Sequence, residues 1–203
     1  MLGSARQLLF WVLFALAASG MLAAEDESHP TLALGSPAPD FALTDENGQP
    51  FKLSDLRGKW ILLAYGYTHC PDVCPLTLSR LRDVKKSIDA DGDRVQVVFV
   101  TIDPERDSAD IMQKYMGHFD QLFPQKFKGL TGSPQEIAQA AKAYNVKYEK
   151  KESTSAGGYS MGHTAEVYLI DPQFNWRMTF PFGVKAEEIA GDVQYLMQHP
   201  EAK

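Results

Sequence analysis

Two cysteines, Cys70 and Cys74, are separated by three residues and are the only cysteines among the 203 residues of the chain. A disulfide between them would close a very short loop, and since disulfide stabilisation grows with loop length, it would contribute little to folding. A chain of this size also buries enough surface to fold without such a link. The spacing therefore indicates redox or metal chemistry, with two buried apolar thiols as the alternative.

A proline follows each cysteine, Pro71 after Cys70 and Pro75 after Cys74. Because proline disfavours helical angles in the residue before it, we expect residues 70–74 to form a tight loop leading into a helix that begins at Pro75. Such a loop keeps both thiols within reach of one ion or of each other. Two soft thiolates with a third ligand suit Cu(I), and an imidazole could also hold Cu(II).

The third ligand must come from elsewhere, and His163 is the best candidate. It follows a Gly-rich segment and precedes a predicted strand, so that segment could bring its ring to the cysteines. For this residue taken alone, a loop histidine without a ligand role is the alternative. The other histidines fit less well, because they lie near a chain end, near a helix end or beside a cysteine that the ring would tune: His29, His199, His118 and His69.

Zinc suits this set less well, since structural zinc sites usually have four protein ligands and the chain has no further thiolate. Met161, close to His163, is more simply a packing residue. Asp72 is either a solvated loop residue or a group that lowers copper affinity for transfer. Asp103 either caps the helix that follows it or interacts with the site.

Apolar runs of strand length alternate with helical patterns along the rest of the chain. Trp60–Tyr65 and Val95–Ile102 are typical of buried central strands, and Ser133 to Glu136 form a capping box that predicts a helix start. Further helices are predicted at 75–92, 108–118 and 185–198, strands at 127–130, 165–170 and 176–180, and an exposed loop or long hairpin tip within 147–162.

This order of elements predicts an α/β fold, a thioredoxin-like sandwich with a central mixed β-sheet flanked by helices. In open α/β sheets, sites lie beyond the carboxyl ends of the strands. The two cysteines, Asp103 and His163 all fall at strand ends in this arrangement.

The composition excludes several classes of protein. With 44% hydrophobic residues the chain is not of the disordered class, and the net charge of -6 argues against a general binder of nucleic acid backbones. No nucleic acid partner is expected.

Residues 1–24 contain one charge, Arg6, followed by the apolar run Leu8–Ala18 and the small residues Ala23 and Ala24. This pattern predicts a signal peptide. A retained N-terminal membrane anchor is the alternative, because the apolar stretch reaches the lower length limit of a span. We expect residues 25–34 to be a linker and residues 35–199 to form a single copper-binding domain.

Three segments, in family order, resemble the Sco/SenC copper proteins: Gly66 to Pro75 with its Cys-Pro-Asp-Val-Cys-Pro motif, Thr101 to Asp107, and Gly162 to Thr164 followed by Tyr168 to Asp171. The resemblance covers residues 33 to 199. It implies a thioredoxin fold in an exported protein that is periplasmic, either soluble or tethered to the inner membrane.

The resemblance also implies that Cys70, Cys74 and His163 bind copper. It implies delivery of copper to the binuclear copper centre in subunit II of cytochrome c oxidase during oxidase assembly. Many members have an acidic residue directly before this histidine, where this chain has Gly162. That departure bears on the hydrogen bonding around the ligand more than on ligation itself.

Other functions would use the same residues. A thiol-disulfide oxidoreductase would cycle Cys70 and Cys74 between dithiol and disulfide and reduce the cysteines of a client. Thioredoxin motifs have two residues between their cysteines rather than three, which argues against a dedicated enzyme. A copper or redox sensor is a further alternative, and a second copper chaperone or a thiol reductant is a further candidate partner. A peroxidase is a third alternative, but the peroxiredoxin pattern has Thr or Ser three residues before the reactive cysteine and Pro seven residues before it, where this chain has Tyr67 and Leu63.

Overall fold

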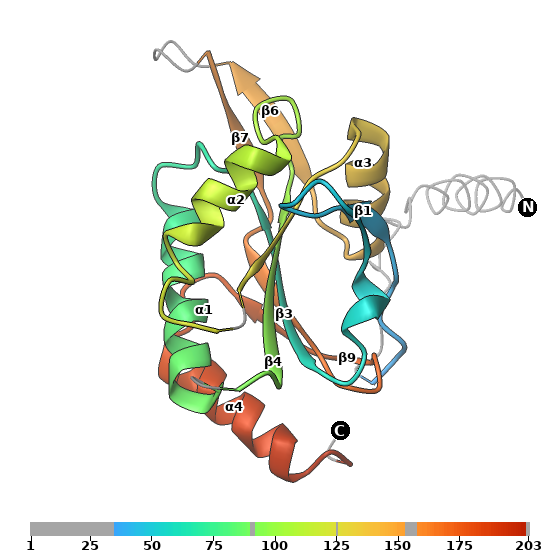
Figure 1. The fold of residues 1–203 in the computed structure, drawn as a ribbon, viewed down its shortest axis with the longest axis vertical. Coiled ribbons are helices and arrows are strands. Elements are labelled where there is room, and N and C mark those ends of the chain that lie inside the picture. The colour runs from blue at the N-terminus through green and yellow to red at the C-terminus, as the bar shows by residue number, and fades with distance from the viewer. Residues whose placement is uncertain (1–34, 90–91, 125, 153–157, 202–203) are drawn as a thin grey trace, which may run out of the picture. The chain divides into compact units, whose positions relative to one another are not determined.

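A computed structural model describes residues 35–89, 92–124, 126–152 and 158–201 of the protein. Its elements are, in chain order (Figure 1), β1 (Ala42–Thr44), β2 (Pro50–Lys52), a 3-10 turn η1 (Leu53–Leu56), β3 (Trp60–Gly66), α1 (Val73–Asp89), β4 (Val95–Thr101), α2 (Ala109–Gly117), β5 (Lys128–Leu130), α3 (Pro134–Ala143), β6 (Tyr148–Glu152), β7 (Tyr159–His163), β8 (Glu166–Ile170), β9 (Trp176–Pro181) and α4 (Ala186–Gln198).

A five-stranded sheet with the order β5-β4-β3-β8-β9 forms the centre of the domain. β3, β4 and β5 run parallel to one another, whereas β8 and β9 pair antiparallel with their neighbours. Every residue of β3 and β4 is buried, as is typical of central strands covered on both faces by other layers. The predicted mixed central sheet is therefore confirmed.

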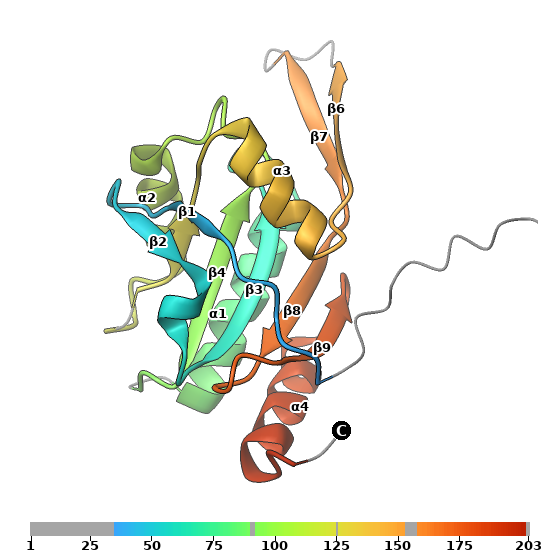
Figure 2. The same cartoon turned by 90° about the vertical axis from the view of Figure 1, so that its right-hand side faces the viewer.

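Helices lie on both faces of this sheet, α1 and α4 on one and α3 on the other (Figures 1 and 2). The predicted capping box begins α3: the Ser133 hydroxyl accepts from the Glu136 N–H, and the Glu136 carboxylate accepts from the Ser133 N–H at 2.8 Å. At edge strand β5, Gly129 lies so close to Met112 and Met116 of α2 that a side chain would meet theirs.

One ion pair is buried between the end of α1 and the start of β4. The Lys85 ammonium lies 3.1 Å from the Asp89 carboxylate and donates to the Val95 carbonyl at 2.7 Å. Burial acts to raise the pKa of Asp89. The Val95 N–H and Lys85 outweigh it and hold that pKa below its ordinary value.

The start of α1 differs from the prediction. The helix begins at Val73 rather than at Pro75, so Cys74 lies in its first turn instead of in a loop. The first N–H groups of a helix have no partner within the helix, and for this reason Pro75 is tolerated there. The helical turn continues through the Leu76 N–H, which donates to the Asp72 carbonyl at 3.1 Å.

Two hairpins complete the described chain. β6 and β7 pair antiparallel, so the segment predicted as a loop or a long hairpin tip is a hairpin, with residues 153–157 outside the described residues. The short strands β1 and β2 form another hairpin, which the sequence did not predict.

The predicted signal peptide or anchor (residues 1–24) and linker (residues 25–34) lie outside the described residues. Within the described ranges we find no helix with the length and apolar character of a membrane span.

Candidate metal centre

The segments that contain the predicted site residues meet at one end of the central sheet. β3 and β4 end in register, Gly66 opposite Thr101. Because β8 runs antiparallel to β3, its first residues lie at this same end. The cysteines follow β3, Asp103 follows β4 and His163 precedes β8, so strand ends bring these residues together.

Cys74 is buried against the sheet, with 2% of its surface exposed, whereas Cys70 is half-buried. The Cys74 N–H donates to the Cys70 sulfur at 3.4 Å, and the two thiols are not linked by a disulfide. Gly66 makes this packing possible, since a Cβ there would lie 2.7 Å from Cys74 Sγ and 2.7 Å from the Phe99 ring.

His163 is the last residue of β7 and faces the buried cysteine. Its Nε2 lies 3.5 Å from Cys74 Sγ, and its Nδ1 lies 2.9 Å from the Thr164 carbonyl. A carbonyl only accepts hydrogen bonds, so Nδ1 carries a proton, and in the neutral imidazole Nε2 is then the nitrogen that can bind a metal ion. A ligating histidine is usually held through its other nitrogen in this way.

Hydrogen bonding shifts the pKa values of the two thiols in opposite directions. The Cys74 thiol donates to the Cys70 sulfur and thereby holds the pKa of Cys70 well below its ordinary value, and His163 and the Cys74 N–H lower it further against the effect of burial. The same bond, together with burial, raises the pKa of Cys74. The pair therefore combines a half-exposed thiolate with a buried thiol.

The donor spacing fits a shared ion. Metal bonds of about 2.3 Å to sulfur and about 2.0 Å to nitrogen that meet at about 110° separate the two donor atoms by about 3.5 Å. The distance between Cys74 Sγ and His163 Nε2 has this value. In the described part of the chain no group of three or more His, Cys, Asp or Glu side chains is already arranged to hold an ion. Cys74 nevertheless contacts both Cys70 and His163, so the three predicted ligands are neighbours.

Asp107 is a buried residue of the site that the sequence reasoning missed. Its carboxylate accepts from the Thr68 N–H at 3.0 Å and from the hydroxyls of Thr68 and Thr101, each at 2.6 Å. Asp107 thus ties the loop before Cys70 to the end of β4. In the sequence it ends the segment Thr101 to Asp107 that resembles the family, but no role was predicted for it.

Five other predicted positions can now be placed, whereas His29 lies outside the described residues. His69 is exposed, and its Nδ1 lies 3.0 Å from the Thr68 hydroxyl and 3.8 Å from the Asp107 carboxylate. Asp72 is exposed, and Met161 packs against the core. His118 and His199 follow the ends of α2 and α4.

Asp103 does not cap the helix that follows it, because α2 has Ser108 at its N-cap. Its carboxylate accepts from the Tyr159 hydroxyl at 2.7 Å and pairs with Arg106. Of the two predicted alternatives, the helix cap is wrong, and the contact of Asp103 with the hairpin that holds His163 favours an interaction with the site.

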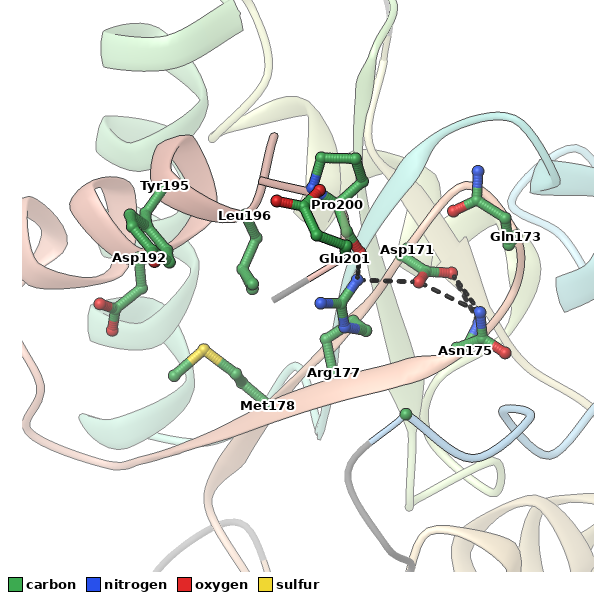
Figure 3. Close-up of a pocket in the computed structure, with 11 residues that line it drawn as sticks. Asp171, Gln173, Asn175, Arg177, Met178, Asp192, Tyr195, Leu196, Pro200 and Glu201 are labelled. Atoms are coloured by element: carbon green, nitrogen blue, oxygen red, sulfur yellow. Dashed lines mark hydrogen bonds and ion pairs between the residues drawn. The ribbon is translucent and has the colours of Figure 1, made fainter. Parts of the chain in front are cut away.

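A cavity of about 520 Å³ lies at the other end of the sheet, between β9 and α4 (Figure 3). Arg177 in this cavity donates to the Asp171 carboxylate and to the Pro200 carbonyl, both at 3.1 Å. The cysteines lie at the opposite end of β8, so this cavity is separate from the candidate metal centre.

Comparison with known proteins assigns the chain to a family. The SCO1/SenC family model matches residues 32–198. A curated relative, the mitochondrial protein SCO2 homolog of Mus musculus, is 36% identical over 157 residues, which are 76% of this chain and 60% of that relative. The chain spans about 60% or less of the first curated relatives it matches.

Solved structures agree with this assignment. Arabidopsis thaliana ScoI with copper bound has a TM-score of 0.71 and 34% identity, over 82% of this chain and 99% of that one. BsSco, described as a member of the Sco family of cytochrome c oxidase assembly proteins, has a TM-score of 0.61 and 22% identity, over 80% and 94%, and indicates the fold alone. The predicted thioredoxin-like fold is confirmed.

The comparisons correct the expected periplasmic location. Curated relatives from Mus musculus, Homo sapiens and Saccharomyces cerevisiae are mitochondrial proteins, so the periplasmic expectation was wrong. The match over residues 32–198, the fold and the cysteine motif together place this chain in the SCO1/SenC family.

Proposed function

We propose that this chain is a copper chaperone that binds copper through Cys70, Cys74 and His163 and delivers it to the binuclear copper centre in subunit II of cytochrome c oxidase. The observation that supports this most directly is the 3.5 Å approach of His163 Nε2 to Cys74 Sγ, with Nδ1 engaged by the Thr164 carbonyl. The copper-bound relative and the description of the Sco family as oxidase assembly proteins support the cargo and the process.

The two thiols give copper uptake a defined proton balance. Cys70 enters as a thiolate, while Cys74 enters as a thiol and loses its proton when the ion binds. Two thiolates and Cu(I) sum to one negative charge, and the neutral imidazole of His163 does not change it. Uptake of each Cu(I) ion therefore releases about one proton to solvent.

Release of the ion begins at the exposed side of the site. Cys70 is half-buried and Cys74 is buried, so an acceptor ligand reaches copper past Cys70. Successive exchange of ligands then moves the ion without leaving it uncoordinated. Soft thiolate and imidazole ligands on the acceptor would suit this exchange.

The metal site is tested by anaerobic Cu(I) titration of the full chain against a competing chelator. The variants Cys70→Ser and Cys74→Ser should lose tight binding, and His163→Ala should bind more weakly while both thiols still titrate. His118→Ala, which removes an exposed histidine after α2, is the matched control and should bind as wild type. X-ray absorption should count two sulfurs and one nitrogen. Wild-type copper stoichiometry in Cys74→Ser would refute the site.

Delivery needs its own experiment. Copper-loaded chain is mixed with the copper-free, reduced copper domain of oxidase subunit II, and the absorption of the binuclear centre is followed. Formation of that centre at the expense of the copper on this chain supports a chaperone. Tight copper binding with no transfer would favour the sensor function instead.

A thiol-disulfide oxidoreductase is the second candidate function, favoured by the half-exposed thiolate of Cys70 beside the buried thiol of Cys74. The Cys70 thiolate would attack a client disulfide and form a mixed disulfide with one client sulfur. Cys74 would then lose its proton, attack the Cys70 sulfur and release that client thiol, so that the client gains the two electrons that the pair loses. If this chain binds no copper but exchanges rapidly with a protein disulfide, the oxidoreductase function becomes the leading one.

A further inference from the structure

The hairpin that contains His163 is separate from the central sheet. β6 and β7 form a two-stranded sheet of their own, which extends beyond the end of the five-stranded sheet (Figure 2). At its base the Thr164 N–H donates to the Lys147 carbonyl at 2.9 Å. Because strand pairing does not tie the hairpin to the sheet, side-chain contacts must decide where it holds His163.

One face of β7 is turned toward the site. Residues two and four apart on a strand share a face, so Tyr159 and Met161 lie on the same face as His163. Ser160 lies on the other face and is exposed, which agrees with this alternation.

Tyr159 fastens the far end of this face to the loop after β4. Its hydroxyl donates to the Asp103 carboxylate at 2.7 Å, and its carbonyl accepts from Arg106 at 3.1 Å. The Arg106 guanidinium lies 3.6 Å from the centre of the Tyr159 ring and also pairs with Asp103. We call these three residues the Tyr159 clamp.

Tyr67 connects the clamp to the ligand. This buried residue directly follows β3, and its ring centre lies 5.7 Å from the Arg106 guanidinium and 6.2 Å from the His163 ring. The Tyr67 hydroxyl also bonds to the backbone of Met161. The inward face of β7 therefore rests on Tyr67 between the clamp and His163.

The other ion pairs of the hairpin are exposed. Lys150 pairs with Glu105 at 2.8 Å, and Lys151 pairs with Glu149 at 2.6 Å, with all four side chains at least 44% exposed. Exposed pairs of this kind add little to stability. The clamp, in which Asp103 is 3% exposed, is the stronger attachment.

We propose that Tyr159 is a positioning residue, which acts through Asp103 and Arg106 to hold the β6–β7 hairpin so that His163 stays beside Cys74. The inference rests on the proposed copper site. Tyr159 itself touches no ion; it limits how far the imidazole can move away from the thiols.

The variant Tyr159→Phe tests this, since it keeps the ring over Arg106 and removes only the hydroxyl that bonds to Asp103. We expect about tenfold weaker Cu(I) binding, the lower end of the usual cost of losing an outer hydrogen bond at a metal site. In the copper-free chain, amide exchange in β7 should be faster, and titration of both thiols should be unchanged. Ser160→Ala is the matched control, because it removes a hydroxyl from the opposite face of the same strand.

The same substitution in a His163→Ala variant shows whether the Tyr159 clamp acts through the histidine ligand. If Tyr159 acts through His163, then Tyr159→Phe costs tenfold in wild type and nothing further in His163→Ala. Equal losses in both backgrounds, or wild-type affinity and β7 exchange in Tyr159→Phe, would overturn the positioning role. Wild-type affinity in His163→Ala would overturn the proposed copper site itself, which is a distinct result.

Discussion

Replacing Gly66 with alanine would put a methyl group where Cys74 and Phe99 already lie. The new Cβ would stand 2.7 Å from Cys74 Sγ and 2.7 Å from the Phe99 ring, whereas unstrained carbon contacts are about 3.5 to 4.0 Å. Cys74 is 2% exposed and Phe99 fully buried, so neither side chain can move out toward solvent.

Overpacking of a buried site costs about 1 to 3 kcal/mol, and two simultaneous close contacts put Gly66→Ala in the upper part of that range, about 2 to 3 kcal/mol. In a domain of this size, 1 kcal/mol shifts the melting temperature by about 2 to 4 °C, so we expect a fall of about 4 to 12 °C. Displacement of the Cys74 sulfur should also weaken copper binding relative to wild type.

Urea unfolding followed by circular dichroism measures the loss of folding free energy in Gly66→Ala. Gly191→Ala is the control: this glycine lies within α4 with no atom within 4 Å of a new Cβ, so the same substitution should stabilise by about 0.5 to 1 kcal/mol. If Gly66→Ala unfolds at the same urea concentration as wild type, the close approach of Cys74 to β3 is not what requires glycine at this position.

Three further substitutions test other features. The buried Tyr115 hydroxyl has no hydrogen-bond partner among the described residues. Tyr115→Phe should therefore raise the free energy of unfolding, measured with urea, by about 1 kcal/mol. A lower free energy of unfolding would mean that the hydroxyl does have a partner. Gly162→Asp should change that energy by less than about 1 kcal/mol, because its Cβ meets only the flexible side chains of Lys151, at 3.0 Å, and Glu149; a large loss would mean rigid packing there. The pKa of Asp89 is lowered in the fold, so its contribution is present above its unfolded pKa, about 4, and is lost as pH falls through the native value. Stability measured from pH 5 down to about 3 should therefore fall less in Asp89→Asn than in wild type, and equal slopes would contradict this.

The sequence predicted those elements whose signals are local. Trp60–Tyr65 forms a central strand because its apolar run can be buried on both faces, and Ser133 begins α3 because its capping bonds lie within one turn. The start of α1 was placed two residues too late, because proline is tolerated at more than one position of a first turn. The prediction that Cys74 lies in a loop was therefore wrong.

The predicted ligands are adjacent in the structure, yet the residues around them could not be found from the sequence. Asp107 acquires its role only when Thr68 and Thr101 meet at one end of the sheet. Tyr159 likewise contacts Asp103 only when the β6–β7 hairpin packs against the loop after β4, and the two residues are more than fifty positions apart in the sequence. Contacts of this kind depend on the tertiary fold, which composition and periodicity do not specify.

The pairing of β3 with β8 has a consequence for how the chain folds. Ile61 pairs with Ile170, so this contact closes a loop of roughly 110 residues, while β3 reaches β4 through α1 alone. Pairings over such separations form slowly. A nascent chain that has completed only β3, α1 and β4 therefore presents Cys70 and Cys74 without their histidine, and the full set of donors exists only once the C-terminal half has joined the sheet.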